Sequence, residues 1–263
     1  MGVFSLVFFI TIMLAGAARA HDGWIEVAPA IVEKGQAVTI ALMQGNHSNE
    51  HRSYRLAGKW DAEFTKVSVV APSGKTTPVN IVDFGEDPEK TGPKGPKGFH
   101  IAQFIADEEG VYTVLARQER DLQHGDGPRF RGVRFARSAF AALALPTVAE
   151  AQKIKAGAPQ ARAGDDLEIV PVDNAAGAVH GAAVTLQVRY KGKPAEAKVV
   201  SIVPKLAGAG AARDFTTDAQ GRVNFMPPAA DAYLARVKFD EKSEHGDLNS
   251  FEATYVFQVF NRR

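Results

Sequence analysis

The sequence contains no cysteine, so neither a disulfide nor a thiolate can contribute to its stability or its chemistry. A metal site would have to use histidine, carboxylate, methionine or main-chain ligands. Common catalytic motifs are missing as well: there is no G-x-S-x-G, no H-E-x-x-H, no P-loop and no G-x-G-x-x-G after a strand. We therefore expect a protein that is not an enzyme.

Residues 1–20 lack any Lys or Arg before their apolar run, which is about thirteen residues long and is followed by small residues. Ala18 and Ala20 occupy the A-x-A positions of a cleavage site, so we expect a signal peptide that is removed between Ala20 and His21. An uncleaved membrane anchor is the alternative, but the run is shorter than the ~20 residues of a spanning helix. Export without cysteine favours a periplasmic location.

An excess of charge of either sign is also missing. The leader holds one Arg, so the remaining 243 residues carry 30 basic and 30 acidic side chains. This balance argues against nucleic acid or an anionic membrane surface as a partner. The length suffices for one large or two ordinary domains with hydrophobic cores.

Short β-branched segments bounded by Gly, Pro or Asn are frequent, whereas no long helical pattern is found before residue 135. In the first half these segments are 38–44, 66–72, 77–84, 98–106 and 110–118. In the second half they are 165–173, 182–194, 197–205, 221–228, 232–240 and 251–260. This pattern predicts an all-β protein of two Ig-like or carboxypeptidase-regulatory-like β-sandwich domains in tandem, with a mixed α+β fold as the alternative.

The Ala-rich segment 133–157, with Pro146 near its centre, interrupts this pattern. Its composition predicts a strand that leads into a short helix or a linker, so we place the domain boundary there. The expected division is a signal peptide at 1–20, an N-terminal β-sandwich with a metal site at 21–145, a linker at 146–160 and a C-terminal Ig-like β-sandwich at 161–263.

Several motifs resemble those of one bacterial family over roughly residues 20–260. They are AHDGWIEVAP (20–29), VEKGQAVTIALMQGNH (32–47), EEGVYTVLARQ (108–118), LEIVPVDN, VRYKGKPAEAKV, TTDAQGRVNF and the closing FEATYVFQV. The family consists of periplasmic proteins of two β-sandwich parts that are associated with nickel and cobalt uptake through energy-coupling-factor-type transporters. The resemblance implies metal handling outside the cytoplasm, and its chemical element is the His-x-x-Trp start formed by His21 and Trp24.

Cleavage after Ala20 would make His21 the first residue, so that its α-amine and imidazole Nδ1 form a two-point chelate for a transition metal. The amine has an ordinary pKa near 7.7, so metal binding should strengthen as the pH rises. The other reading is that the cleavage site happens to precede a histidine.

Further candidate ligands lie in polar segments. His47 and His51 are four residues apart in GNHSNEHRSY, and His124 lies in a Gly-rich segment beside Asp121 and Asp126. Solvated loop residues are the alternative for all three. His100 alternates with apolar residues and is expected to be a half-buried, hydrogen-bonded residue.

We therefore expect a periplasmic accessory protein that binds Ni²⁺ or Co²⁺ through His21, His47, His51 and His124 and serves a membrane metal-uptake transporter. Alternatives are a Cu²⁺-binding carrier with an N-terminal His chelate and a metal-free β-sandwich interaction module. A copper oxidase acting on polysaccharide is disfavoured, because the sequence shows no cluster of exposed aromatic residues.

Overall fold

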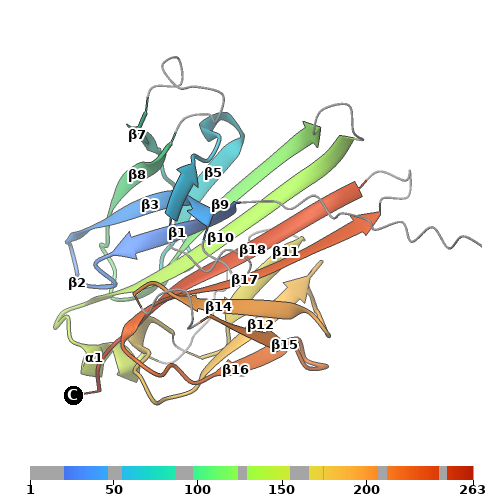
Figure 1. The fold of residues 1–263 in the computed structure, drawn as a ribbon. Coiled ribbons are helices and arrows are strands. Elements are labelled where there is room, and N and C mark those ends of the chain that lie inside the picture. Colours follow the sequence, from blue (N-terminus) through green and yellow to red (C-terminus); the bar gives the residue numbers. More distant parts are fainter. Residues whose placement is uncertain are drawn as a thin grey trace, which may run out of the picture.

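The computed structural model describes residues 21–46, 55–86, 97–123, 129–154, 166–173, 175–206, 212–242 and 248–262. They form three β-sheets with three short helical segments: η1 (Ala62–Phe64), α1 (Val148–Lys153) and η3 (Ala175–Gly177). The predicted all-β sandwich class is therefore confirmed (Figure 1). No helix within these ranges is long and apolar enough to cross a membrane. The expected signal peptide lies outside the described residues.

Two of the sheets are small. Sheet A has the strand order β1–β3–β8–β7, with β4 also paired to β3, and sheet C has the order β11–β12–β13, with β16 also paired to β12. The strands of sheet A are β1 (Asp22–Ala28), β3 (Ala37–Asn46), β4 (Arg55–Gly58), β7 (Val82–Gly85) and β8 (Gly98–Ile105). Those of sheet C are β11 (Leu167–Pro171), β12 (Val184–Tyr190), β13 (Lys193–Pro194) and β16 (Arg222–Phe225).

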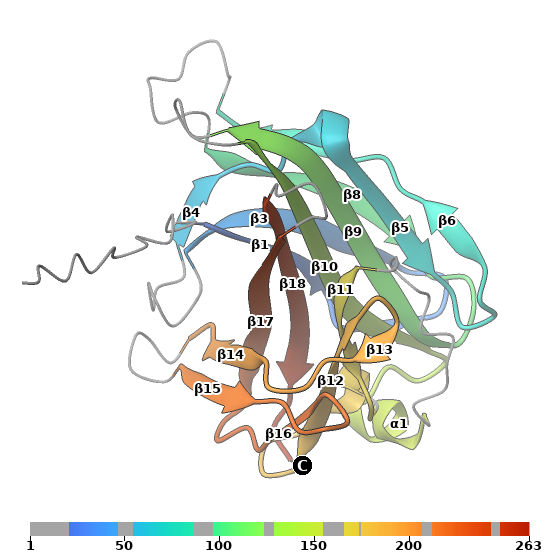
Figure 2. The same ribbon diagram turned by 90° about the vertical axis from the view of Figure 1, so that its right-hand side faces the viewer.

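Sheet B has nine strands in the order β15–β14–β17–β18–β10–β9–β5–β6, with β2 also paired to β10. From the first half of the chain come β2 (Ile31–Glu33), β5 (Thr65–Val70), β6 (Thr76–Pro78), β9 (Gly110–Gln123) and β10 (Arg129–Leu143). From the second half come β14 (Val199–Pro204), β15 (Arg213–Thr216), β17 (Asp231–Lys242) and β18 (Leu248–Val259). Figure 2 shows β10, β18 and β17 side by side in the middle of the molecule.

The two halves of the chain are joined within sheet B. Strand β10 pairs in parallel with β18, from Phe130 opposite Leu248 to Ser138 opposite Val256. The last strand of the chain is thus a neighbour of the last strand of the first half. The division into domains at 146–160 stays a prediction, and the strands on either side of it belong to one sheet.

Sheets A and C cover opposite faces of sheet B. Successive side chains of a strand point to opposite faces, and on β10 the side chains of Ala136 and Phe140 pack with sheet A. Val133 and Phe135, at odd-numbered positions, belong instead to the core that includes sheet C. Strand β18 is covered on both faces, and its residues Ser250–Phe257 are all buried.

The structure differs from the sequence-based elements in a few places. The segment 77–84 divides into β6 and β7, and the chain from Asp22 to Ala28 is a strand that the sequence analysis did not identify. A tight turn lies between Asp218 and Gly221, where the Gly221 N–H donates to the Asp218 carbonyl at 2.8 Å. β16 follows it directly.

Candidate functional site

Strand β1 carries the HDGW motif and lies between the two halves of the molecule. Its side chains alternate between two environments, as the pleat of a strand requires. Ile25 and Val27 pack in the core beneath sheet A. Trp24, on the other face, is 1% exposed and packs on Leu234 and Val256 of β17 and β18. Trp24 is therefore a packing residue, and β1 contacts both halves at once.

Asp22 brings a carboxylate into this contact. It is 1% exposed, and its Oδ1 lies 2.7 Å from Arg236 Nε and 2.6 Å from Lys238 Nζ. Both cations belong to β17, on the face of sheet B that β1 covers. A buried carboxylate is tolerated where cations compensate its charge, and here two of them do so.

Glu252 is the second buried carboxylate, on β18 opposite Arg134. Its Oε1 accepts the Gly23 N–H at 2.7 Å and lies 3.3 Å from Arg134 Nε, while its Oε2 lies 3.3 Å from Lys238 Nζ. Burial would raise the pKa of Glu252, but the positive charges of Arg134, Lys238 and Arg236 outweigh it and lower this pKa to about 2. Glu252 is therefore ionised at neutral pH.

Gly23 is enclosed by these groups. A Cβ at this position would lie 2.4 Å from Arg134 Cδ and 2.8 Å from Trp60 Cζ2. Its carbonyl accepts a hydrogen bond from Thr254 Oγ1 at 2.8 Å. Only glycine fits this site without movement of its neighbours. Close packing therefore explains why the second residue of the DGW sequence is glycine.

His21 is partly exposed and directly precedes the buried segment. Its carbonyl accepts a hydrogen bond from Arg134 Nη2 at 3.2 Å. The Arg134 guanidinium also donates to Gln44 Oε1 at 3.2 Å and lies 5.4 Å from the centre of the Trp60 ring. The main chain at His21 is therefore tied to a fixed group of side chains.

The other three candidate ligands, His47, His51 and His124, lie outside the described residues. Strand β3 ends at Asn46, and β1 pairs with it from Asp22 opposite Gly45 onward. Within the ranges that the structure describes, no three His, Asp or Glu side chains are grouped as metal ligands. The four-histidine site stays a prediction.

His100 is a buried strand residue. It is 4% exposed, and its Nε2 lies 2.8 Å from the Trp60 carbonyl oxygen, within hydrogen-bond distance. Trp60 is itself 2% exposed, and its Nε1 donates to the Met43 carbonyl at 2.7 Å. Both residues therefore contribute to packing beside β3.

The sequence analysis missed the charge cluster made by Asp22, Arg134, Arg236, Lys238 and Glu252. A signal for it exists in sheet B, because each of its strands that contributes to the cluster carries a charge between apolar residues, as in SFEATYVF around Glu252. Alternation of this kind ordinarily indicates a solvated strand face. This face is buried instead because β1 packs over it.

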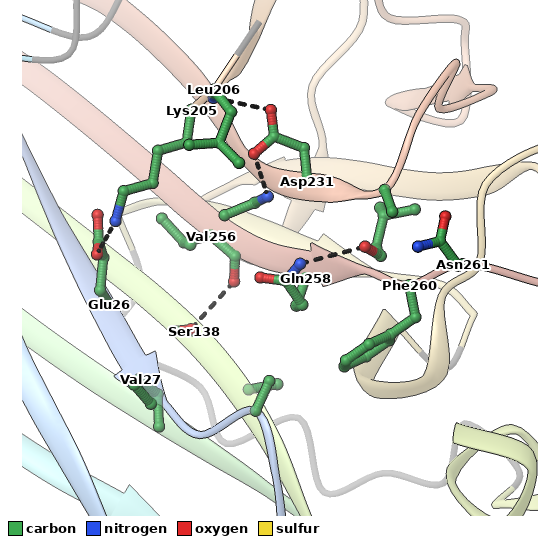
Figure 3. Close-up of a pocket in the computed structure, with 16 residues that line it drawn as sticks. Glu26, Val27, Ser138, Lys205, Leu206, Asp231, Val256, Gln258, Phe260 and Asn261 are labelled. Carbon is green, nitrogen blue, oxygen red and sulfur yellow. Dashed lines mark hydrogen bonds and ion pairs between the residues drawn. The ribbon is translucent and has the colours of Figure 1, made fainter. Parts of the chain in front are cut away.

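A cavity of about 510 Å³ opens near the end of β1 that is remote from Asp22, where the pairing of β10 with β18 ends. Its walls come from the end of β1, from β10 at Ser138, from the start of β17 and from the end of β18. Lys205 and Leu206 complete the lining on one side. Figure 3 shows Glu26 and Lys205 on one side of the space and Phe260 and Asn261 on the other. Lys205 Nζ lies 2.8 Å from Glu26 Oε2.

Comparison with known proteins gives one family match. The family described as "Domain of unknown function (DUF4198)" matches residues 18–241. No curated protein matches the chain. The family match is thus to a family of unknown function, and the expected link to nickel and cobalt uptake stays a prediction.

Similar solved structures contain β-sandwich domains. They include a 1.5-MDa bacterial ice-binding adhesin (13% identity, TM-score 0.24, 92% of this chain and 65% of that chain), the mouse nectin-like molecule 4 ectodomain (12%, 0.23, 91% and 64%) and two fibronectin type III domains of chicken tenascin (14%, 0.23, 90% and 99%). The chain spans slightly less than two thirds of the first two proteins. At these identities the likeness concerns the fold alone.

Proposed function

The chain belongs to the DUF4198 family, and on that premise we propose that it is a periplasmic, non-catalytic protein that binds Ni²⁺ or Co²⁺. In this proposal residues 1–20 are a signal peptide, and their removal after Ala20 exposes the α-amine of His21. The protein then supplies the ion to a membrane metal-uptake transporter.

The position of His21 carries the proposal. A two-point chelate of amine and imidazole binds more tightly when its backbone is already held in place, since ordering a free terminus costs conformational entropy. Arg134 holds the His21 carbonyl at 3.2 Å, and Asp22 is fixed by two cations directly afterwards. The terminus is thus preorganised while the imidazole side of His21 remains partly exposed.

The register of sheet A supports a second ligand from the segment after β3. Asp22 lies opposite Gly45, His21 precedes Asp22 by one residue and His47 follows Gly45 by two. The start of β1 and the end of β3 therefore lie next to each other, and His21 and His47 are each within two residues of these strand ends. His51 and His124 complete the proposed ligand set, which uses imidazole donors suited to Ni²⁺ and Co²⁺.

The direct test is calorimetric titration of the chain that begins at His21 with Ni²⁺, Co²⁺ and Cu²⁺. We expect a site for Ni²⁺ or Co²⁺ with a Kd below about 10 μM, which corresponds to about −6.8 kcal/mol. One Ala added before His21 should weaken it at least tenfold, because the chelating amine becomes an amide. Affinity should rise from pH 6.5 to 8.5 as the amine loses its proton.

A matched control is His180→Ala, which removes a partly exposed imidazole from the second half of the chain. It should leave the affinity unchanged, whereas His21→Ala should reproduce the effect of the added Ala. Absence of any site tighter than about 10 μM would reject metal binding. Because Cu²⁺ binds most His sites best in vitro, the metal that copurifies from the periplasm decides between the nickel or cobalt role and a copper carrier.

A further inference from the structure

The cavity beside the end of β1 contains a carboxylate whose charge is not balanced by a cation. Asp231 is 5% exposed, and its Oδ1 and Oδ2 accept the main-chain N–H groups of Ala232 at 2.7 Å and Leu206 at 2.8 Å. Among the residues that the structure describes, no Lys, Arg or His forms an ion pair with it. Buried charges in proteins are ordinarily paired, so this site favours an added positive charge.

The remaining charges of the cavity do not supply that cation. Lys205 is the one cationic residue in its lining, and its Nζ lies 2.8 Å from Glu26 Oε2. With Glu26, Asp231 and Lys205 ionised, the lining carries a net charge of −1. Each carboxylate oxygen can accept more than one hydrogen bond, so Asp231 retains acceptor capacity beyond its two N–H donors.

The shape and the apolar part of the lining favour an aliphatic group. The space is about 510 Å³, within the range of ligand sites in proteins. Small side chains leave it open, since five lining residues are alanines: Ala28, Ala30, Ala139, Ala230 and Ala232. Val256 and Phe260 add larger apolar surface on the wall formed by β18 and the residue after it (Figure 3).

We propose that this cavity binds an aliphatic ammonium group, with the nitrogen at Asp231 and the methylene chain against the alanine-lined wall. The ammonium donates hydrogen bonds to Asp231 and balances its charge, while the chain removes apolar surface from water. The group belongs either to a small free amine or to a lysine side chain of another protein. This inference does not depend on metal binding at His21.

The test uses the full exported chain and three probes of similar size: n-pentylamine, 1-pentanol and pentanoate. Binding is followed by NMR through the shifts of main-chain amides that line the cavity, such as those of Val27, Ala139 and Gln258. We expect saturable binding of pentylamine with a Kd in the millimolar range. Pentanol and pentanoate should bind at least tenfold more weakly, because they lack the positive charge.

Two variants locate the site. Asp231→Asn removes the charge but keeps an acceptor oxygen, and it should weaken pentylamine binding at least tenfold. Ala139→Leu fills the space from a partly exposed position and leaves Asp231 in place, so it should abolish binding without unfolding the protein. The matched control Ala62→Leu, at an exposed residue of η1, should bind pentylamine as the unmodified chain does.

The source of the group is decided by a fourth probe, acetyl-Gly-Lys-Gly-amide. Tighter binding of this peptide than of pentylamine would assign the site to a lysine of a partner protein, and weaker binding would assign it to a free amine. Equal binding of pentylamine and pentanol, shifts confined to other parts of the chain, or no saturation at about 50 mM would overturn the proposal. Each of these outcomes leaves the His21 titration unaffected.

Discussion

Individual residues of the buried charge cluster depend on one another. Asp22 and Glu252 are both about 1% exposed, and they are surrounded by Arg134, Arg236 and Lys238. Removing one partner from such a group leaves a buried charge uncompensated, which typically costs about 3–5 kcal/mol. The cluster therefore fixes where β1 docks more than it adds to net stability.

The depressed pKa of Glu252 predicts a pH-dependent contribution to stability. The pKa is about 2 in the folded chain and near 4.5 in its ordinary state, so the unfolded chain binds a proton between these values and the folded chain does not. The contribution is complete above about pH 5 and is lost as the pH falls toward 2. It amounts to a few kcal/mol, because each tenfold change in proton affinity corresponds to about 1.4 kcal/mol.

Urea unfolding of the unmodified chain and of Glu252→Gln between pH 2.5 and 7 measures this contribution. The variant should be less stable at pH 7, and the gap in the free energy of unfolding should shrink steadily below pH 5. Glu33→Gln removes an exposed carboxylate on β2 and should stay within about 0.5 kcal/mol of the unmodified chain. A gap for Glu252→Gln that is the same at pH 3 and pH 7 would contradict the assignment.

Gly23 gives a second prediction at this scale. Gly23→Ala places a Cβ against Arg134 and Trp60, so one of these side chains must move, at a cost of about 1–3 kcal/mol in the free energy of unfolding. Gly58→Ala is the matched control, because the atom nearest to its Cβ is Gln44 Nε2 at 3.2 Å, against 2.4 Å for Arg134 Cδ at Gly23. Urea unfolding should separate the two variants, and equal stabilities would show that Gly23 is not sterically required.

At the scale of elements, β1 determines whether the polar face of β18 in sheet B is buried. The even-numbered side chains of β18 include Glu252 and Thr254, which bond to the main chain of Gly23, while odd-numbered Phe251 and Tyr255 pack with sheet C. A strand that alternates in this way is ordinarily half-exposed. Here the polar face is covered by β1, whose Gly23 N–H donates to Glu252 and whose Gly23 carbonyl accepts from Thr254.

A comparison of β1 with the other strands shows which parts of the fold the sequence could predict. Strand-length segments such as 110–118 and 251–260 contain enough β-branched and aromatic residues to identify the all-β class and most strands of sheet B. For the segment after Ala20 the sequence predicts only a chemical role, because Asp22 and Gly23 are poor strand formers. Their strand conformation comes from pairing with β3 and from contacts with Arg236, Lys238 and Glu252, more than 200 residues away, which local patterns do not encode.

The candidate site could be predicted only in part for a related reason. His21 was identified as a candidate ligand by its place after the cleavage signal. The other candidate histidines were identified by their residue type and their polar surroundings in the sequence. Asp231 carried no such signal, since it precedes an ordinary strand pattern. Among the described residues its carboxylate has no cationic partner, and the main-chain N–H groups of Leu206 and Ala232 hold it instead. The contact with Leu206, 25 residues away, is not visible in the sequence.

For the molecule as a whole, sharing of sheet B by both halves predicts cooperative unfolding. Sheets A and C pack on opposite faces of the same strands, and β18 is buried between them, so neither core can open without exposing the other. Trp60 belongs to the sheet A core, whereas Trp24 packs on Leu234 and Val256 of the second half. The fluorescence of Trp60, measured in a Trp24→Phe background, can therefore show whether damage to the sheet C core is transmitted.

Leu186→Ala makes a cavity in the sheet C core, where Leu186 is fully buried on β12, and should cost about 2–5 kcal/mol. In a cooperative molecule the tryptophan transition and the calorimetric transition fall together, by roughly 5–15 °C, with equal calorimetric and van't Hoff enthalpies. Val199→Ala, at a 57% exposed position on β14, is the control and should shift both by less than about 2 °C. If Leu186→Ala leaves the tryptophan transition in place while a separate transition appears at lower temperature, the halves unfold independently. That result would mean that the sheet A core persists after the sheet C core has unfolded and the β10–β18 pairing has broken.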